Sequence, residues 1–119
     1  MRFLSSLGLL KERLAYERSE GMKLYQPRCL VEPPIMLAVE SAWKGLELII
    51  QDIVDRFDLD GDKCIEFGVE FGYSTVALSN YFRRVTGVDL FVGDIHTVHK
   101  GLHFDETRAS LSRYENIEP

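Results

Sequence analysis

The spacing of apolar residues predicts helices in the first half of the chain. Steps of three and four residues between apolar side chains mark one face of a helix. Near the amino terminus, such steps join Phe3, Leu7, Leu10 and Leu14. A proline-rich loop follows over 26–34. The range 35–57 then repeats the steps at Trp43, Leu46, Ile50, Ile53 and Phe57. We therefore expect an amino-terminal helical segment over residues 1–57.

The pattern then changes to strands that alternate with helices. Short apolar runs predict one strand over 63–67 and a second over 84–89. A helix of about 74–82 lies between them, with Ser74 and Thr75 as caps at its start, and Asp105 is suited to cap a last helix over 106–114. Strands joined through a helix pair in parallel with a right-handed crossover. The predicted fold class is α/β, a Rossmann-like doubly wound parallel sheet with amino-terminal helices.

Two strands are readable before the sequence ends. A parallel sheet of that size leaves both edges open and its faces incompletely buried. The alternation of strand and helix asks for a third strand where the sequence stops. We therefore interpret residues 58–119 as the first part of a cofactor-binding domain, truncated before its third strand. Pairing with another copy of the chain or with a partner chain is expected.

Composition narrows the class of protein. The chain has 119 residues, 45% of them hydrophobic and 28% charged, which is typical of one small soluble domain. The net charge of −5 argues against nucleic acid or an anionic membrane as partner. No apolar run is long enough to span a bilayer. Cys29 and Cys64 lack the spacing of a disulfide framework, which favours a reducing, cytoplasmic location.

The turn after the first strand carries the candidate chemistry. Gly68 and Gly72 allow a ligand to approach the backbone, and the following helix start offers amide donors to it. A dinucleotide motif would need glycine where this sequence has Glu70 and Tyr73. A nicotinamide-dependent oxidoreductase is therefore disfavoured.

A ligand with a nucleoside at one end and a zwitterionic amino acid at the other fits the turn better. It has no pyrophosphate, so Glu70 is tolerated. Asp89 ends the second strand about twenty residues after Gly68, where an acidic side chain accepts hydrogen bonds from ribose hydroxyls. Leu90 and Phe91 are then placed to pack against a purine.

The two strand ends resemble the motifs of a known family. The run Ile-Glu-Phe-Gly-Val-Glu-Phe-Gly over 65–72 is similar to the first motif of class I S-adenosylmethionine-dependent methyltransferases, with Glu70 in place of its middle glycine. Val88-Asp89-Leu90 is similar to their second motif. Within that family, the sequence over about residues 63–117 most resembles the small-molecule O-methyltransferases that are grouped with macrocin methyltransferase and the cephalosporin hydroxylase-like proteins. The resemblance implies that Asp89 holds the ribose of S-adenosylmethionine, and that the methionine end is lined by Glu66, Gly68 and Gly72.

The resemblance implies methyl transfer from S-adenosylmethionine to a hydroxyl of a small-molecule acceptor. Such a reaction needs a group that takes the hydroxyl proton, and our candidates are His96 and His99 in a histidine-rich loop. We expect no metal, because that loop lacks a recognised ligand spacing and the acidic run over 58–62 lacks the glycine and glutamate of a calcium loop. The alternative is a non-catalytic methyltransferase-like domain that acts through protein–protein association.

Overall fold

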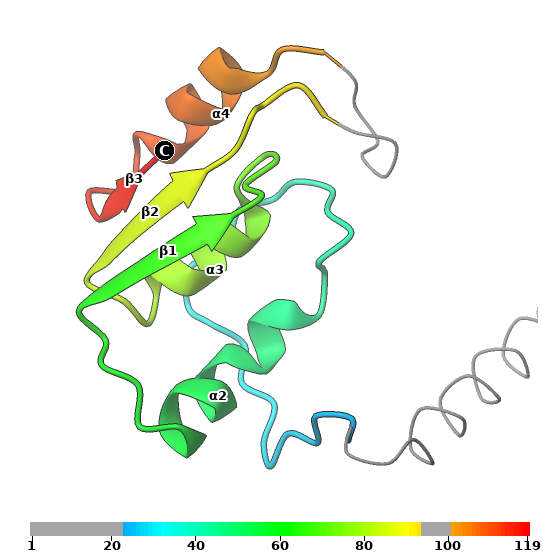
Figure 1. Ribbon diagram of the computed structural model, residues 1–119, viewed down its shortest axis with the longest axis vertical. Helices are drawn as coiled ribbons and strands as arrows, with labels where there is room; N and C mark the ends of the chain where they lie inside the picture. Colours follow the sequence, from blue (N-terminus) through cyan, green and yellow to red (C-terminus); the bar gives the residue numbers. More distant parts are fainter. Residues whose placement is uncertain (1–22, 94–100) are drawn as a thin grey trace, which may run out of the picture.

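The computed structural model describes residues 23–93 and 101–119. Its elements, in chain order, are η1 (Leu46–Leu48), α2 (Ile50–Arg56), β1 (Lys63–Phe67), α3 (Tyr73–Ser79), β2 (Arg84–Val88), α4 (Phe104–Leu111) and β3 (Ile117–Glu118), as Figure 1 shows. The helix predicted near the amino terminus lies outside the described residues.

The strands form one parallel sheet in the order β1-β2-β3. Lys63 pairs with Arg84 and Phe67 with Val88, so β1 and β2 end level with each other. The connection between them runs through α3, and the predicted α/β class with a parallel sheet is confirmed. Because β1 and β2 end at the same level, the residues that follow the two strands meet at one edge of the sheet.

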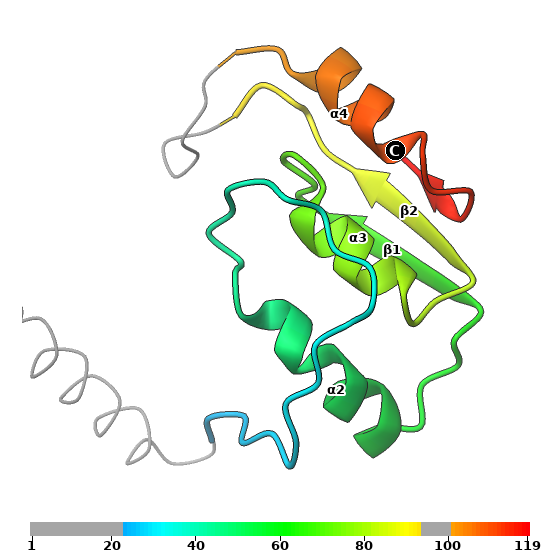
Figure 2. The same ribbon diagram turned by 180° about the vertical axis from the view of Figure 1, so that it is seen from behind.

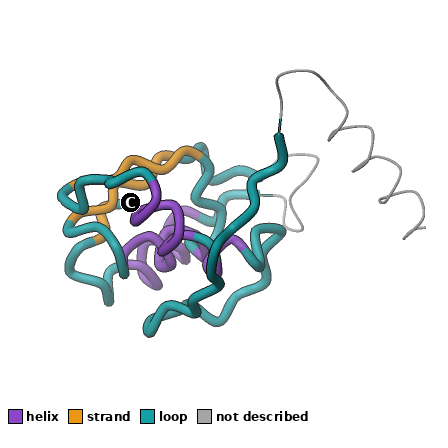
Figure 3. The backbone as a smooth tube through the Cα atoms, turned by 90° about the horizontal axis from the view of Figure 1, so that it is seen from below, coloured by secondary structure: helices purple, strands orange, loops and turns teal. Residues whose placement is uncertain are grey.

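The helices of the described part lie on one face of the sheet. Figures 1 and 2 show α3 behind β1 and β2 and then in front of them, and Figure 3 shows strands and helices as separate layers. The buried core between the layers consists of Val69, Val76, Val85, Phe91, Leu111 and Ile117. This packing fixes α3 and α4 against the sheet, and so fixes the turns that enter them.

The other face of the sheet is apolar and exposed in the described part of the chain. Side chains alternate between the faces of a strand. On this face Ile65 is 63% exposed, Phe67 80% and Val88 45%. A group of exposed apolar side chains on one face is typical of a contact surface.

The third strand begins inside the chain rather than beyond its end, so this prediction was wrong. β3 has two residues, too few for an alternating pattern, and Ile117 is its one buried residue. The Val85 amide donates to the carbonyl of Asn116 (2.8 Å), and the Asn116 side-chain amide donates to the carbonyls of Ser79 and Phe82. These bonds hold the end of the chain beside β2.

The helix predicted over 35–57 is present only in its second half, as η1 and α2, and the described residues 35–45 contain no helix. The Trp43 amide donates to Ser41 Oγ (3.1 Å), and the Gly45 amide donates to the Glu47 carboxylate (2.7 Å). Gly45 has a φ of +105°, outside the helical region. Such local side-chain bonds compete with helical ones. The expected apolar stripe is broken, and Trp43 and Phe57 are each 59% exposed.

The bounds of the two later helices differ from those expected by one to three residues. Helix α3 ends at Ser79 rather than near Phe82. Helix α4 begins at Phe104, so Asp105 lies in its first turn and His103 occupies the N-cap position.

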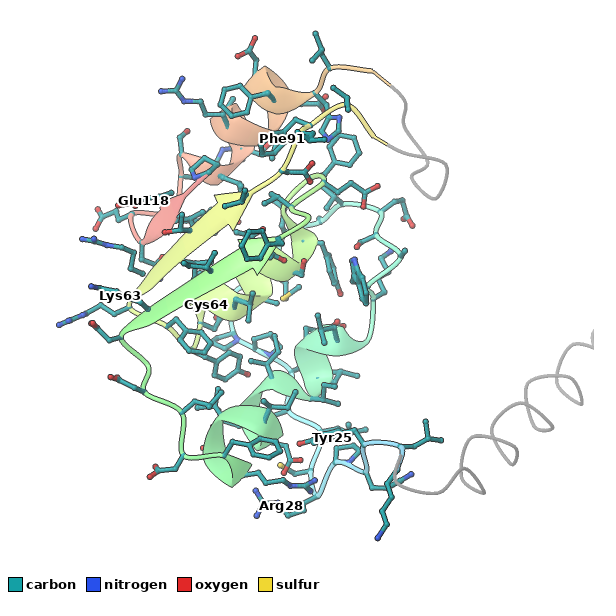
Figure 4. All side chains as sticks on the ribbon, in the orientation of Figure 1. Tyr25, Arg28, Lys63, Cys64, Phe91 and Glu118 are labelled. Carbon is teal, nitrogen blue, oxygen red and sulfur yellow. The ribbon has the colours of Figure 1, made fainter. Side chains whose placement is uncertain are left out.

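A buried carboxylate ties the segment before η1 to α2. Asp52 accepts hydrogen bonds from the Tyr25 hydroxyl and from Arg28 Nε (2.9 Å), and it pairs with Arg56 (3.2 Å). Figure 4 shows Tyr25 and Arg28 beside α2. The Tyr25 hydrogen bond is the main cause that lowers the pKa of Asp52 to about 2.

Candidate functional site

A cavity of about 480 Å³ opens at the carboxyl ends of β1 and β2. Its volume lies in the range of small-molecule sites. Parallel α/β sheets bind ligands at this edge because the loops that leave the strands converge there. The lining residues are Ala42, Trp43, Phe67, Gly68, Glu70, Asp89, Leu90, Val92, Gly93 and His103.

Asp89 lies on the cavity wall directly after β2. One carboxylate oxygen accepts the Glu70 amide (2.7 Å) and the other accepts the Phe91 amide (2.8 Å). Burial alone would raise the pKa of Asp89, but these two amides, together with those of Val69 and Leu90, lower it overall. Asp89 is therefore ionised at neutral pH.

The two glycines of the turn have different surroundings. Gly68 has a φ of +89°, lines the cavity, and has no atom within 4 Å of the place where a Cβ would lie. Gly72 has a φ of +90°, and a Cβ there would lie 2.6 Å from Leu111 Cδ2. Gly68 is therefore at the cavity, whereas Gly72 is buried under α4 and does not line it.

Glu66 points away from the cavity and toward α3. Its carboxylate accepts hydrogen bonds from the hydroxyls of Ser74 and Thr75, both of them buried. The position of Glu66 thus locks β1 to the first turn of α3. Ser74 and Thr75, expected as helix caps, donate to Glu66 instead, and the N-cap position is held by Gly72 without a side-chain cap.

Glu70 occupies the position of the motif's middle glycine and keeps a glycine-like backbone. Its φ is +51°, in the left-handed region where glycine is favoured. Its amide donates to Asp89, and its carbonyl accepts the Thr107 hydroxyl (3.0 Å) from α4. These bonds hold the turn in a conformation that glycine would otherwise favour, and they leave a carboxylate on the cavity wall.

The remaining cavity wall is largely apolar. Leu90, predicted to pack against a purine, lines the cavity and is 84% exposed. Trp43, Phe67 and Val92 line it as well, although the sequence did not single them out as site residues. Phe67 could have been identified from its position in β1, because side chains alternate along a strand and Phe67 falls on the face opposite Glu66. No sequence signal marked Trp43, since the helical spacing predicted that it is buried.

His103 contributes the one imidazole of the described residues to this wall. Its ring lies 4.6 Å from the Phe71 ring and 5.8 Å from the Phe91 ring, between centroids. Nδ1 lies 3.0 Å from the Gly101 carbonyl oxygen, so Nδ1 carries a proton for this hydrogen bond. Nε2 is buried and has no hydrogen-bond partner in the described part.

The candidate bases His96 and His99 lie outside the described residues. Over 23–93 and 101–119, no group of three or more His, Cys, Asp and Glu side chains is arranged to hold a metal ion. Of the five residues predicted to bind the cofactor, the structure brings Gly68, Asp89 and Leu90 together at the cavity. Glu66 and Gly72 instead support the junction of β1 with α3.

No described helix combines the length and apolar character needed to cross a membrane. Comparison of the chain with protein-family models, with curated proteins and with solved structures finds no match.

Proposed function

We propose that this chain is the cofactor-binding part of a Rossmann-like methyltransferase, which binds S-adenosylmethionine in the cavity and transfers its methyl group to a hydroxyl of a small molecule. The observation that carries the proposal is Asp89, an ionised carboxylate at the end of β2 on the wall of a ligand-sized cavity. An acidic side chain at this position suits the two hydroxyls of a ribose.

The cavity's charge and polarity also fit this ligand. Glu70 and Asp89 place two acidic side chains on the wall, which disfavours a pyrophosphate and suits a ligand with a cationic sulfonium beside a zwitterionic amino acid end. Gly68 leaves open space for a ligand beside the backbone. Leu90 offers an apolar surface to a purine.

The residues of this chain would bind and orient the reactants. When bound, S-adenosylmethionine supplies a methyl group that its sulfonium activates toward a nucleophilic oxygen. Asp89 would fix the nucleoside end, and alignment of this kind is a large part of catalysis. His96 and His99 remain our candidates for the group that takes the hydroxyl proton. The free thiols of Cys29 and Cys64 support a cytoplasmic setting.

Thermal melts with and without S-adenosylhomocysteine test the proposal. A ligand present at a hundred times its Kd and bound only by the folded state stabilises that state by about 2.7 kcal/mol. We expect S-adenosylhomocysteine to raise the melting midpoint of the wild type and to cause no shift in the midpoint of Asp89→Ala. A cooperative wild-type melt that never shifts would refute ligand binding by this chain.

The matched control is Asp60→Ala. Asp60 also accepts a backbone amide, that of Asp62 (3.0 Å), but it does not line the cavity. Because Asp89→Ala also removes bonds that hold the turn, its own midpoint falls before any ligand is added. The comparison therefore uses the ligand-induced shift of each variant, which Asp60→Ala should retain in full.

A second candidate function is protein–protein association without catalysis. The exposed apolar sheet face formed by Ile65, Phe67 and Val88 favours it. In this case sedimentation velocity would show concentration-dependent association that Ile65→Glu abolishes, and the melts would show no response to S-adenosylhomocysteine. Ile65 is the suitable position because, unlike Phe67, it does not line the cavity.

A further inference from the structure

We infer that Trp43 forms an aromatic wall that stacks on the flat base of the bound nucleoside and so sets the affinity of the cavity for it. The inference rests on the proposed function and adds a recognition residue that lies outside both strand-end motifs. Trp43 lines the cavity from the turn that precedes η1.

The exposure of Trp43 needs an explanation. Its side chain is 59% exposed, although burying an aromatic side chain is among the larger favourable terms in folding. The turn around it is otherwise polar or small, with Ser41, Lys44 and Gly45. An indole held in solvent on a cavity wall is suited to a ligand that covers it.

The backbone around Trp43 is fixed on both sides. The Trp43 amide donates to Ser41 Oγ (3.1 Å), and the Trp43 carbonyl accepts the Leu46 amide (3.0 Å). The Gly45 amide donates to the Glu47 carboxylate (2.7 Å). A wall that is ordered before the ligand arrives loses little entropy on binding, which favours affinity.

The turn is also tied to the cavity floor. Tyr73, the first residue of α3, has its pKa raised to about 12 by burial and by a hydrogen bond with Glu47. Helix α3 begins directly after the turn that carries Gly68 and Glu70. Trp43 is thus linked through Glu47 to the segment that forms the floor.

The chemistry of the ligand follows from the arrangement. A ribose at Asp89 places its base among the apolar walls, where Trp43 and Leu90 lie. A planar base can stack on an indole, whereas an aliphatic amino acid cannot. Removal of one base–aromatic stack weakens binding by about tenfold or more.

The indole itself reports on the contact, because Trp43 is the chain's only tryptophan. We would titrate the chain with S-adenosylhomocysteine, adenosine and methionine, and follow the emission and its quenching by acrylamide. S-adenosylhomocysteine and adenosine should change the emission and shield the indole from acrylamide, since both carry the base. Methionine should do neither.

Calorimetry on variants measures the contribution to affinity. Trp43→Leu should weaken the binding of S-adenosylhomocysteine by about tenfold, and Trp43→Phe should restore most of it because a ring is kept. Phe57→Leu is the matched control: Phe57 is also 59% exposed but does not line the cavity, so its substitution should leave the Kd unchanged.

Failure of the inference can be told apart from failure of the proposed function. If S-adenosylhomocysteine raises the melting midpoint while the emission stays constant and Trp43→Leu binds as the wild type does, the inference is wrong and ligand binding stands. An equal loss in Phe57→Leu and Trp43→Leu would likewise overturn it. If the wild type shows neither a midpoint shift nor an emission change, both proposals fall.

Discussion

The two glycines of the central turn should differ sharply in what an alanine costs. Gly68 and Gly72 have nearly the same φ, +89° and +90°, so a Cβ imposes comparable backbone strain of about 1–2 kcal/mol at either position. At Gly72 the new methyl would also lie 2.6 Å from Leu111 Cδ2. Overpacking of a buried site costs a further ~1–3 kcal/mol. We expect a loss of roughly 2–5 kcal/mol for Gly72→Ala and about 1–2 kcal/mol for Gly68→Ala.

Urea unfolding of both variants measures the difference. A double-mutant cycle with Leu111→Ala isolates its cause, since the shorter side chain makes room for the methyl group. In that background Gly72→Ala should cost only the strain that Gly68→Ala costs. Equal losses for the two single variants, or a Gly72→Ala cost that Leu111→Ala leaves unchanged, would refute the packing argument. Gly68→Ala should mainly reduce the midpoint shift given by S-adenosylhomocysteine, because Gly68 lines the cavity.

Substitutions at three further positions test the contacts that support the fold and the site. Glu66→Ala should destabilise the fold by roughly 2–4 kcal/mol in urea unfolding, because it leaves the buried Ser74 and Thr75 hydroxyls without their acceptor, and Glu66→Gln should cost less. Glu70→Gly relieves the left-handed strain and should raise stability by up to about 1 kcal/mol, read from the same unfolding curves. The folded pKa of Asp52, about 2, lies below its ordinary 3.8, so its stabilising contribution is present above pH 3.8 and is lost as pH falls toward 2. Melting midpoints across that range should therefore fall less steeply for Asp52→Asn than for the wild type.

The sequence predicts β1 and β2 well because their signals are local. Apolar runs bounded by turn residues mark both strands, and the bounds match to within one residue. The helix prediction fails over 35–45, because the side chains of Ser41 and Glu47 accept hydrogen bonds from backbone amides that would otherwise bond within a helix. A pattern of apolar steps carries no information about such bonds. It also misses β3, which owes its assignment to pairing with β2 rather than to a pattern of its own.

The candidate site is only partly predictable for a related reason. Spacing after a strand places Gly68, Asp89 and Leu90 at one edge of the sheet, and the structure brings them to one cavity. Spacing does not say which way a side chain points. The alternation of side chains along a strand does give this direction. Glu66 lies two residues after Cys64, whose side chain faces the core, so Glu66 also faces α3. Gly72 is buried because it packs against Leu111. These two residues are distant in sequence, so a local pattern does not predict their contact.

Glu70 adds a charge to the cavity while the turn keeps a backbone conformation that glycine favours. The amide and carbonyl of Glu70 are held by Asp89 and Thr107, so its left-handed backbone does not depend on glycine. What differs from a glycine motif is therefore a second acidic side chain beside Asp89. That charge opposes anionic ligands and favours a cationic group. Replacing Glu70 with glycine should thus weaken the binding of a cationic nucleoside more than that of a neutral one such as adenosine.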